Sequence, residues 1–395
     1  MRSRSVLLLL ALVTFALVFC SQIPLKSPER IVPKPRHPSR TLISSSSKGL
    51  AQPQEPLPPK WEDKRGPTAS QPDFPSHAGT LAPTLAPRLQ PRTPRPRNHV
   101  VLTRHDPRVP PECAGGVFHW SSTQPKYGLC THGYGDVVSS FFLRDGFWRD
   151  CQPLPPLLAR LQKGFDVKNP TVVDVGANIG SCAVWLAVSN HAKVFAFEPM
   201  SLNLEMLRVS IQFNGLEDDI VLIPSGAADI NSSQVLYSEH GNLGNSVIMR
   251  SSQNHGPAQQ DVLKRARQWG TQTITTQLID DTVKEHVHLM KLDCQGCEYK
   301  ALLGARALLK THGVDIVRTE FDPSFLRAQG DSPLSLLELL WEHQFTIYDG
   351  MNQHLITREG AAQFIEQKEK QATDLVAISK GILLRNDITW DDVIH

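Results

Sequence analysis

The chain has 395 residues, of which 30 are proline and 7 are cysteine, and its formal net charge is +2 at pH 7. This length could hold two domains, but the uneven spread of proline favours one folded domain. The nearly balanced charge gives no general attraction to nucleic acid and argues against a nucleic-acid-binding protein.

Residues 1–22 have the pattern of a targeting segment. Arg2 and Arg4 precede a mostly apolar run at 6–20, which is short for a membrane span of about 20 residues and long for a cleaved signal core. A signal-anchor would leave the amino terminus cytosolic and the rest lumenal. Cleavage before Ser21 would instead release a secreted protein. Both interpretations predict the secretory pathway.

Residues 23–110 are predicted to form an extended stem. Residues 21–100 hold 17 of the 30 prolines, and such a segment buries too little apolar surface to fold. A short anchor followed by a proline-rich stem is typical of type II Golgi membrane proteins with a lumenal domain. We therefore expect that location, with secretion as the alternative.

Residues 111–165 form a cysteine-containing region ahead of the main fold. Cys113, Cys130 and Cys151 predict at least one disulfide in an oxidising compartment, with the pairing open. The aromatic pair Phe147 and Trp148 either caps the sheet or lines a substrate cleft.

Residues 166–395 alternate between strand and helix patterns, which predicts a Rossmann-like, doubly wound, mostly parallel α/β sheet. The expected strands are 171–175, 193–198, 219–224, 271–276, 287–293, 314–320, 345–348 and 376–384, and the expected helices are 179–189, 201–214, 278–283, 299–310, 333–343 and 359–372. The polar stretch 238–270 is either a substrate loop or a disordered insert.

The turn after strand 171–175 predicts a nucleotide-like cofactor. Asp174, Gly176 and Gly180 span the turn, and Glu198 ends the next strand, where it can accept hydrogen bonds from two ribose hydroxyls. A dinucleotide site would show a third glycine and face a pyrophosphate. A carboxylate repels phosphate and suits a cation, so the turn favours S-adenosylmethionine over NAD.

Several motifs carry a family resemblance. They are Asp174-Val-Gly-Ala-Asn-Ile-Gly180, Phe197-Glu-Pro199, Asn203, Asn214-Gly215 and Leu292-Asp-Cys-Gln-Gly-Cys-Glu298. Residues 165–350 thereby resemble the FkbM-type S-adenosylmethionine-dependent methyltransferases. The resemblance implies a seven-stranded sheet with an antiparallel last strand, and cofactor contacts from Asp174, Gly176, Asn178, Gly180 and Glu198. It also implies an acidic residue near the adenine, for which Asp229 is the candidate, with an ordinary Asx turn as the alternative.

Three carboxylates are candidates for the catalytic work. Transfer of a methyl group to oxygen, which the resemblance implies, needs a group that takes the hydroxyl proton. Asp293 and Glu298 flank the turn after strand 287–293, and Glu320 ends the next strand. Glu298 is alternatively a helix-terminal carboxylate that accepts backbone N–H groups, and Glu320 an ordinary surface carboxylate.

The same turn departs from the family pattern Asp-Val-Glu-Gly-Ala-Glu. Here Gln295 replaces a carboxylate, and Cys294 and Cys297 form a C-x-x-C pair. The pair is a redox pair, a zinc half-site, or two packed residues with or without a local disulfide. We expect no metal site. The sequon at Asn231 predicts a glycoprotein if it is used.

The leading functional hypothesis is S-adenosylmethionine-dependent O-methylation of a glycan or small-molecule acceptor in the secretory pathway. One alternative is a catalytically inactive binding protein, motivated by Gln295. Another is a nucleotide-sugar transferase, although the Asp-x-Asp motif that this class requires is absent from the sequence. We expect no nucleic-acid partner, and we expect contact with the membrane through the anchor. The oligomeric state is left open.

Overall fold

The computed structural model describes residues 113, 115–239, 241–249, 270–369 and 371–385. The expected targeting segment 1–22 and stem 23–110 lie outside these residues, so both stay predictions. Within the described ranges, no helix has the length and apolar character needed to cross a membrane. All described residues belong to one unit, Arg97–His395, of the two into which the contacts divide the chain.

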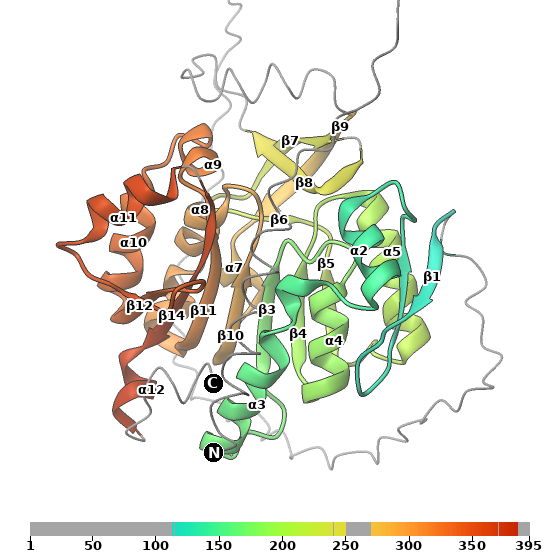
Figure 1. Cartoon of the computed structure of the whole chain (residues 1–395), viewed down its shortest axis with the longest axis horizontal. Helices are drawn as coiled ribbons and strands as arrows, with labels where there is room; N and C mark the ends of the chain where they lie inside the picture. Colours follow the sequence, from blue (N-terminus) through green and yellow to red (C-terminus); the bar gives the residue numbers. More distant parts are fainter. Residues whose placement is uncertain (1–112, 114, 240, 250–269, 370, 386–395) are drawn as a thin grey trace, which may run out of the picture. The chain divides into compact units, whose positions relative to one another are not determined.

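An eight-stranded sheet forms the centre of this unit, in the order β13-β12-β14-β11-β10-β3-β4-β5 (Figure 1). The strands are β3 (Thr171–Val175), β4 (Lys193–Phe197), β5 (Ile220–Ile223), β10 (Val287–Leu292), β11 (Val314–Phe321), β12 (Phe345–Asp349), β13 (Leu355–Ile356) and β14 (Thr373–Ser379). Strands β5, β4, β3, β10 and β11 are parallel, and β14 is antiparallel to β11 and β12.

The doubly wound, mostly parallel α/β fold with an antiparallel last strand is therefore confirmed. The expected number of seven strands is corrected to eight in this sheet, because β13 pairs with β12 and adds a two-residue edge strand. The last strand also ends earlier than expected. It stops at Ser379, where its pairing with β12 ends, and the chain continues as a helix.

Helices cover both faces of the sheet, because successive residues of a buried strand point to opposite sides. Val172 packs into one core and Val173 into the other. The first layer comprises α3 (Leu154–Phe165), α4 (Ser181–Asn190), α5 (Ser201–Asn214) and α12 (Lys380–Arg385); the second comprises α7 (Ile279–Thr282), α8 (Glu298–Leu303), the π-helical turn η3 (Leu308–His312), α9 (Pro323–Ala328), α10 (Pro333–Glu342) and α11 (Ala361–Lys368).

The expected helix 299–310 is divided into α8 and η3 near Gly304. A side chain there would place its Cβ 2.0 Å from the backbone oxygen of Ala228. The glycine therefore allows a close approach between α8 and the segment that follows the third parallel strand, but it interrupts the regular helix.

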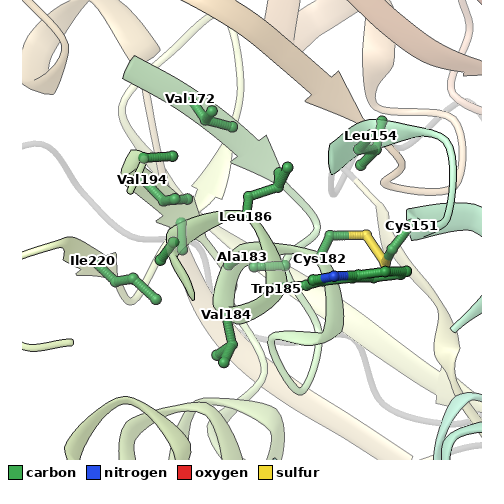
Figure 2. Packing of buried hydrophobic residues seen from close by; sticks show 14 of the residues in the cluster. Cys151, Leu154, Val172, Cys182, Ala183, Val184, Trp185, Leu186, Val194 and Ile220 are labelled. Carbon is green, nitrogen blue, oxygen red and sulfur yellow. A yellow bond between two sulfur atoms is a disulfide. The ribbon is translucent and has the colours of Figure 1, made fainter. Parts of the chain in front are cut away.

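The cysteine-containing region packs onto the first core. Its elements are β1 (Val117–Trp120), β2 (Gly128–Thr131), α2 (Val137–Asp145) and the 3-10 turn η2 (Arg149–Cys151). A disulfide joins Cys113 to Cys130, and a second joins Cys151 in η2 to Cys182 in α4, next to the ring of Trp185 (Figure 2). The expected upstream disulfide is confirmed, and the second one ties this region to the main sheet layer.

A second, four-stranded sheet lies at the carboxyl edge of the central one, in the order β6-β9-β7-β8 (Figure 1). Its strands are β6 (Gly226–Ala227), β7 (Ser232–Glu239), β8 (Asn242–Met249) and β9 (Gly270–Gln277). The interpretation of 238–270 as a loop or disordered insert is wrong for β8, which pairs antiparallel with β7. Residues 250–269 lie outside the described residues.

Candidate active site

The turn between β3 and α4 is shaped by glycines that no other residue can replace. Gly176 has φ +76°, and a Cβ at this position would lie 1.9 Å from the backbone oxygen of Asp293. Gly180 has φ +91° and caps the start of α4. These positions require the left-handed conformation that glycine adopts without strain. The first turn is thereby pressed against the turn that follows β10.

Glu198 lies directly after β4 and is only 4% exposed. Its carboxylate accepts hydrogen bonds from Asn178 N at 2.7 Å, Met200 N at 2.9 Å and Asn203 Nδ2 at 3.3 Å. Burial raises the pKa of Glu198 to about 7, although these three donors oppose the shift. Asn178, Glu198 and Asn203, which the motifs singled out, are thus joined in one network.

A first cavity, of about 50 Å³, opens beside this carboxylate, and we call it the Glu198 cavity. It is lined by the ends of β3 and β4, by β6, by the turn after β10, and by the β7–β8 hairpin. Its lining residues include the apolar Phe197, Ala227, Leu236, Leu243 and Ile248. A carboxylate facing apolar walls suits a ligand that combines hydroxyl groups with a flat apolar ring.

The β7–β8 hairpin is held over this cavity by an aspartate from the upstream region. One carboxylate oxygen of Asp136 accepts from Leu243 N at 2.9 Å, and the other accepts from Ser139 N at 2.9 Å as the N-cap of α2. Because Asp136 bonds both elements, α2 and the hairpin are positioned together.

A second cavity, of about 250 Å³, lies next to the first, and we call it the Glu320 cavity. Gly176, Asn178, Gly244 and Asp293 line both cavities. The remaining lining of the Glu320 cavity is largely polar and includes Trp148, Asp150, Ser181, Asn242, Asn245, Lys291, Gln295, Arg318, Glu320 and Asp374. The two cavities meet at Asp293, which is where groups held in each would approach one another.

Lys291 is a residue of this site that the motif analysis missed. Its Nζ lies 3.1 Å from Asp174 Oδ1 and 3.7 Å from Asp293 Oδ2, and its side chain is 9% exposed. Burial alone would lower the pKa of Lys291, but the two carboxylates outweigh it and raise that pKa. The available signal was one lysine in the otherwise apolar end of strand 287–293, which a buried parallel strand tolerates only when the charge is paired.

Asp174 is the penultimate residue of β3 and is fully buried. One carboxylate oxygen bonds Lys291, whereas Oδ2 has no hydrogen-bond partner in the described part of the chain. A buried carboxylate oxygen without a donor is costly. Asp174 lines neither cavity, so its carboxylate acts on the site through its ion pair with Lys291.

Asp293 and Glu320 are brought together by the residue that departs from the family pattern. Gln295 Nε2 donates to Asp293 Oδ1 at 3.2 Å and to Glu320 Oε2 at 3.0 Å. Burial and then the neighbouring carboxylates Asp293 and Glu298 raise the pKa of Glu320 well above its usual range. The amide thus holds two carboxylates side by side at the larger cavity, where a bound hydroxyl could pass its proton to one of them.

Glu298 lines neither cavity. It is 1% exposed, begins α8, and accepts from Cys294 N at 3.0 Å and Gly296 N at 3.2 Å. Burial raises its pKa to about 7. These contacts support the interpretation of Glu298 as a helix-terminal carboxylate that shapes the turn, rather than as a group that meets a substrate.

Asp229 also lies outside the lining of both cavities. It is half-buried and follows β6, whose residues Gly226 and Ala227 line the Glu198 cavity instead. Its proposed position near an adenine stays a prediction. Trp148 lines the Glu320 cavity, which favours the cleft interpretation for that aromatic residue, whereas Phe147 packs against Trp185.

Three further residues of the Glu320 cavity come from elements that sequence motifs did not connect. Arg318 on β11 forms an ion pair with Asp374 on the antiparallel β14, and Asp150 comes from η2. Burial and the charges of Asp293 and Asp374 raise the pKa of Asp150. Cys294 and Cys297 form a disulfide with each other, so the zinc half-site interpretation does not hold for this state.

Comparisons with known proteins place this geometry in context. Residues 174–347 match the family model described as "Methyltransferase FkbM domain". A precorrin-6y C5,15-methyltransferase from Geobacter metallireducens aligns with a TM-score of 0.30 at 10% identity, over 57% of this chain and 86% of that one. The human methyltransferase 10 domain containing protein aligns with a TM-score of 0.29 at 11% identity, over 57% and 82%. A search among curated proteins found no match.

Proposed function

We propose that this chain, whose residues 174–347 form a methyltransferase FkbM domain, uses S-adenosylmethionine to methylate a hydroxyl oxygen of a glycan or small-molecule acceptor in the secretory pathway. The observation that carries the proposal is the pair of adjoining cavities. One has a buried carboxylate set for a ribose, the other has paired carboxylates, and Asp293 lies where they meet.

The residues present fit the proposed cofactor. Glu198 offers carboxylate oxygens at an apolar cavity, which suits ribose hydroxyls beside an adenine. Asp174 lines neither cavity, but its buried carboxylate adds negative charge next to the glycine turn, which suits the cationic amino acid end. Gly176 lines both cavities and has no side chain that would intrude on a ligand. When bound, S-adenosylmethionine would supply an electrophilic methyl group.

The charge of the site favours this cofactor over a dinucleotide. Asp174 is buried next to the glycine turn, and a pyrophosphate there would meet a carboxylate rather than free backbone N–H groups alone. Lys291 is already shared between Asp174 and Asp293, so it is not available to neutralise a phosphate.

The acceptor side supports oxygen methylation. A hydroxyl becomes a nucleophile when a base takes its proton as the bond forms. Glu320 has a raised pKa and lines the Glu320 cavity, and Gln295 orients it together with Asp293. The replacement of the family carboxylate by Gln295 therefore leaves two carboxylates in reach of an acceptor. The polar lining with one tryptophan suits a hydroxyl-rich acceptor.

Three disulfides support the proposed compartment. The cross-links Cys113–Cys130, Cys151–Cys182 and Cys294–Cys297 are typical of proteins that fold in an oxidising lumen. Together with Arg2, Arg4 and the apolar run at 6–20, they favour a Golgi membrane protein with a lumenal domain, or a secreted protein if the segment is cleaved.

Calorimetry on the purified full chain tests the cofactor. We expect micromolar binding of S-adenosylmethionine and S-adenosylhomocysteine, and binding weakened about 100-fold in Glu198→Ala. A folded protein that binds neither compound would refute the proposal. Binding would justify a screen of glycan and small-molecule acceptors with a labelled methyl donor, in which turnover should fall about 100-fold or more in Glu320→Gln if Glu320 is the base.

A further inference from the structure

The disulfides of this protein differ in what they join. Cys113–Cys130 and Cys151–Cys182 span 17 and 31 residues and connect separate elements. Cys294–Cys297 spans 3 residues and closes a single turn. A cross-link within one turn constrains little of the unfolded chain, so its contribution to global stability is small compared with that of the longer links. A role for Cys294–Cys297 is therefore to be sought in the turn that it closes.

The short disulfide lies in the wall of the proposed cofactor site. Both Cys294 and Cys297 line the Glu198 cavity, and Cys294 is the more exposed of the two. Cys113 and Cys130 line neither cavity and are buried. A ligand that fills the Glu198 cavity therefore covers this disulfide and leaves Cys113–Cys130 unaffected.

The turn that the disulfide closes carries the contacts of the acceptor side. Gln295 has φ +58°, a left-handed conformation that costs energy for a residue with a Cβ. In that conformation its amide reaches both Asp293 and Glu320. Gly296 has φ +97°, and a Cβ there would lie 2.7 Å from Phe325 O, so the turn is also packed tightly against α9.

From this placement we propose that Cys294–Cys297 is a reversible redox modification site, opened by a dithiol reductant, and that the disulfide form is the form competent to bind cofactor. The inference rests on the proposed function and adds a regulation of the same site. With the disulfide open, Gln295 is free to leave the left-handed conformation and to release the two carboxylates.

The chemistry balances as ordinary thiol–disulfide exchange. A thiolate of the reductant attacks the sulfur of Cys294, a mixed disulfide forms, and Cys297 leaves as a thiolate with the electron pair of the broken bond. The second thiol of the reductant then closes its own disulfide and releases Cys294. The protein gains two electrons and two protons. Reduced Cys297 has an acceptor in place, because its Sγ lies 3.6 Å from Ala227 O.

Cofactor binding and reduction must then oppose each other. If reduction weakens binding by a given factor, bound cofactor makes reduction less favourable by the same factor, because the two equilibria are linked. A tenfold difference in affinity corresponds to a shift of about 30 mV in the midpoint potential of this two-electron couple. The coupling can thus be measured from either side.

The experiment uses the full chain with dithiothreitol as reductant and S-adenosylhomocysteine as ligand. Alkylation of freed thiols and peptide mapping would follow each disulfide separately. We expect Cys294–Cys297 to open at least tenfold faster than Cys113–Cys130, and saturating ligand to slow that opening about tenfold while leaving Cys113–Cys130 unchanged. Calorimetry should give an affinity about tenfold lower for the reduced protein.

A double variant provides a second test. Cys294→Ser with Cys297→Ser should bind S-adenosylhomocysteine like the reduced protein, and Cys113→Ser with Cys130→Ser is the matched control. Equal affinities of the oxidised and reduced wild-type protein, or equal opening rates with and without ligand, would overturn the redox inference alone. No binding by the oxidised protein would instead overturn the proposed function and the coupling with it.

Discussion

The two edges of the central sheet both gather ionisable residues, but only one of them forms a site. At the carboxyl edge, Asp174 and Glu320 lie one residue before the ends of β3 and β11, and Asp293 follows β10. Asp293 and Glu320 line the Glu320 cavity. At the amino edge, His286, His288 and Asp315 occupy the starts of the neighbouring strands β10 and β11. The difference lies in how far each group is already satisfied.

The amino edge is closed on itself. His286 Nε2 lies 2.9 Å from Asp315 Oδ2, and Thr171 N donates to His288 Nδ1 at 3.0 Å. In the described part of the chain, these three residues could together hold a metal ion, because one potential ligand atom of each lies within 4.8 Å of the others. A metal ion would compete with the Thr171 hydrogen bond or require loss of a second ring proton. Burial lowers the pKa of His288, which favours the neutral ring.

The carboxyl edge has buried carboxylates, and two of them, Glu198 and Glu320, line cavities. Asp174 Oδ2 lacks a donor among the described residues, and Glu198 and Glu320 have raised pKa values because burial disfavours their charge. Charge at a strand end therefore does not identify a functional site. A carboxylate with a raised pKa that lines a cavity is the better indicator, and parallel sheets offer that combination at their carboxyl ends.

The largest expected effect is on folding and concerns the lysines of the two edges. Lys291→Met should lower the free energy of unfolding by about 3–5 kcal/mol, because it leaves the fully buried Asp174 without its cation and also removes the pairing of the partly exposed Asp293. Lys193→Met should lower it by less than about 1 kcal/mol, since its partner Glu285 is well exposed. Urea denaturation followed by circular dichroism would measure both. Similar losses in the two variants would contradict the contrast.

The next effect is on cofactor binding. Glu198→Ala should weaken binding of S-adenosylhomocysteine about 100-fold, because two hydrogen bonds to a charged group are lost at about 1.5 kcal/mol each. Glu285→Ala is the matched control at the amino edge and should bind like the wild type. Calorimetry on both variants measures the ratio, and unchanged binding in Glu198→Ala would remove the assigned role.

A smaller effect should appear in the pH dependence of binding. The pKa of Glu198 is about 7 in the free protein. In the proposed complex, ribose hydroxyls would donate to the ionised carboxylate, so binding should favour the charged form. The affinity for the cofactor should be highest above the pKa of Glu198 and should fall as the pH drops through 7, by about tenfold between pH 8 and pH 6. Glu198→Gln should abolish this dependence, and a flat wild-type profile would contradict it.

The smallest effect should come from the histidines of the amino edge. His286 is 45% exposed, so His286→Ala should change the free energy of unfolding by less than about 1 kcal/mol. Cofactor affinity should stay the same, since His286 lines neither cavity. A variant with clearly weakened binding would show that the two edges are coupled.

Local sequence patterns predicted the parts of the fold whose contacts are close in the chain. The run from β3 through α4 to β4 was predicted because apolar strands, a glycine turn and a carboxylate at a set interval specify one strand–helix–strand unit. Strand β8 was missed because its apolar residues Leu243, Val247 and Ile248 are separated by polar residues and glycine, which masks the strand pattern. These side chains are buried only through packing against residues distant in the sequence. The edge strand β13 is too short to leave a pattern.

The sequence by itself determined the Rossmann-like α/β class and the glycine turn, since these depend on backbone conformation and short intervals. Only the tertiary structure decided that Lys291 pairs with Asp174, that Gln295 joins Asp293 to Glu320, and that Glu298 serves its own turn. Lys291 and Asp174 are separated by 117 residues and meet because β3 and β10 are neighbours in the sheet. Such meetings follow from strand order and burial, which no local pattern of residues specifies.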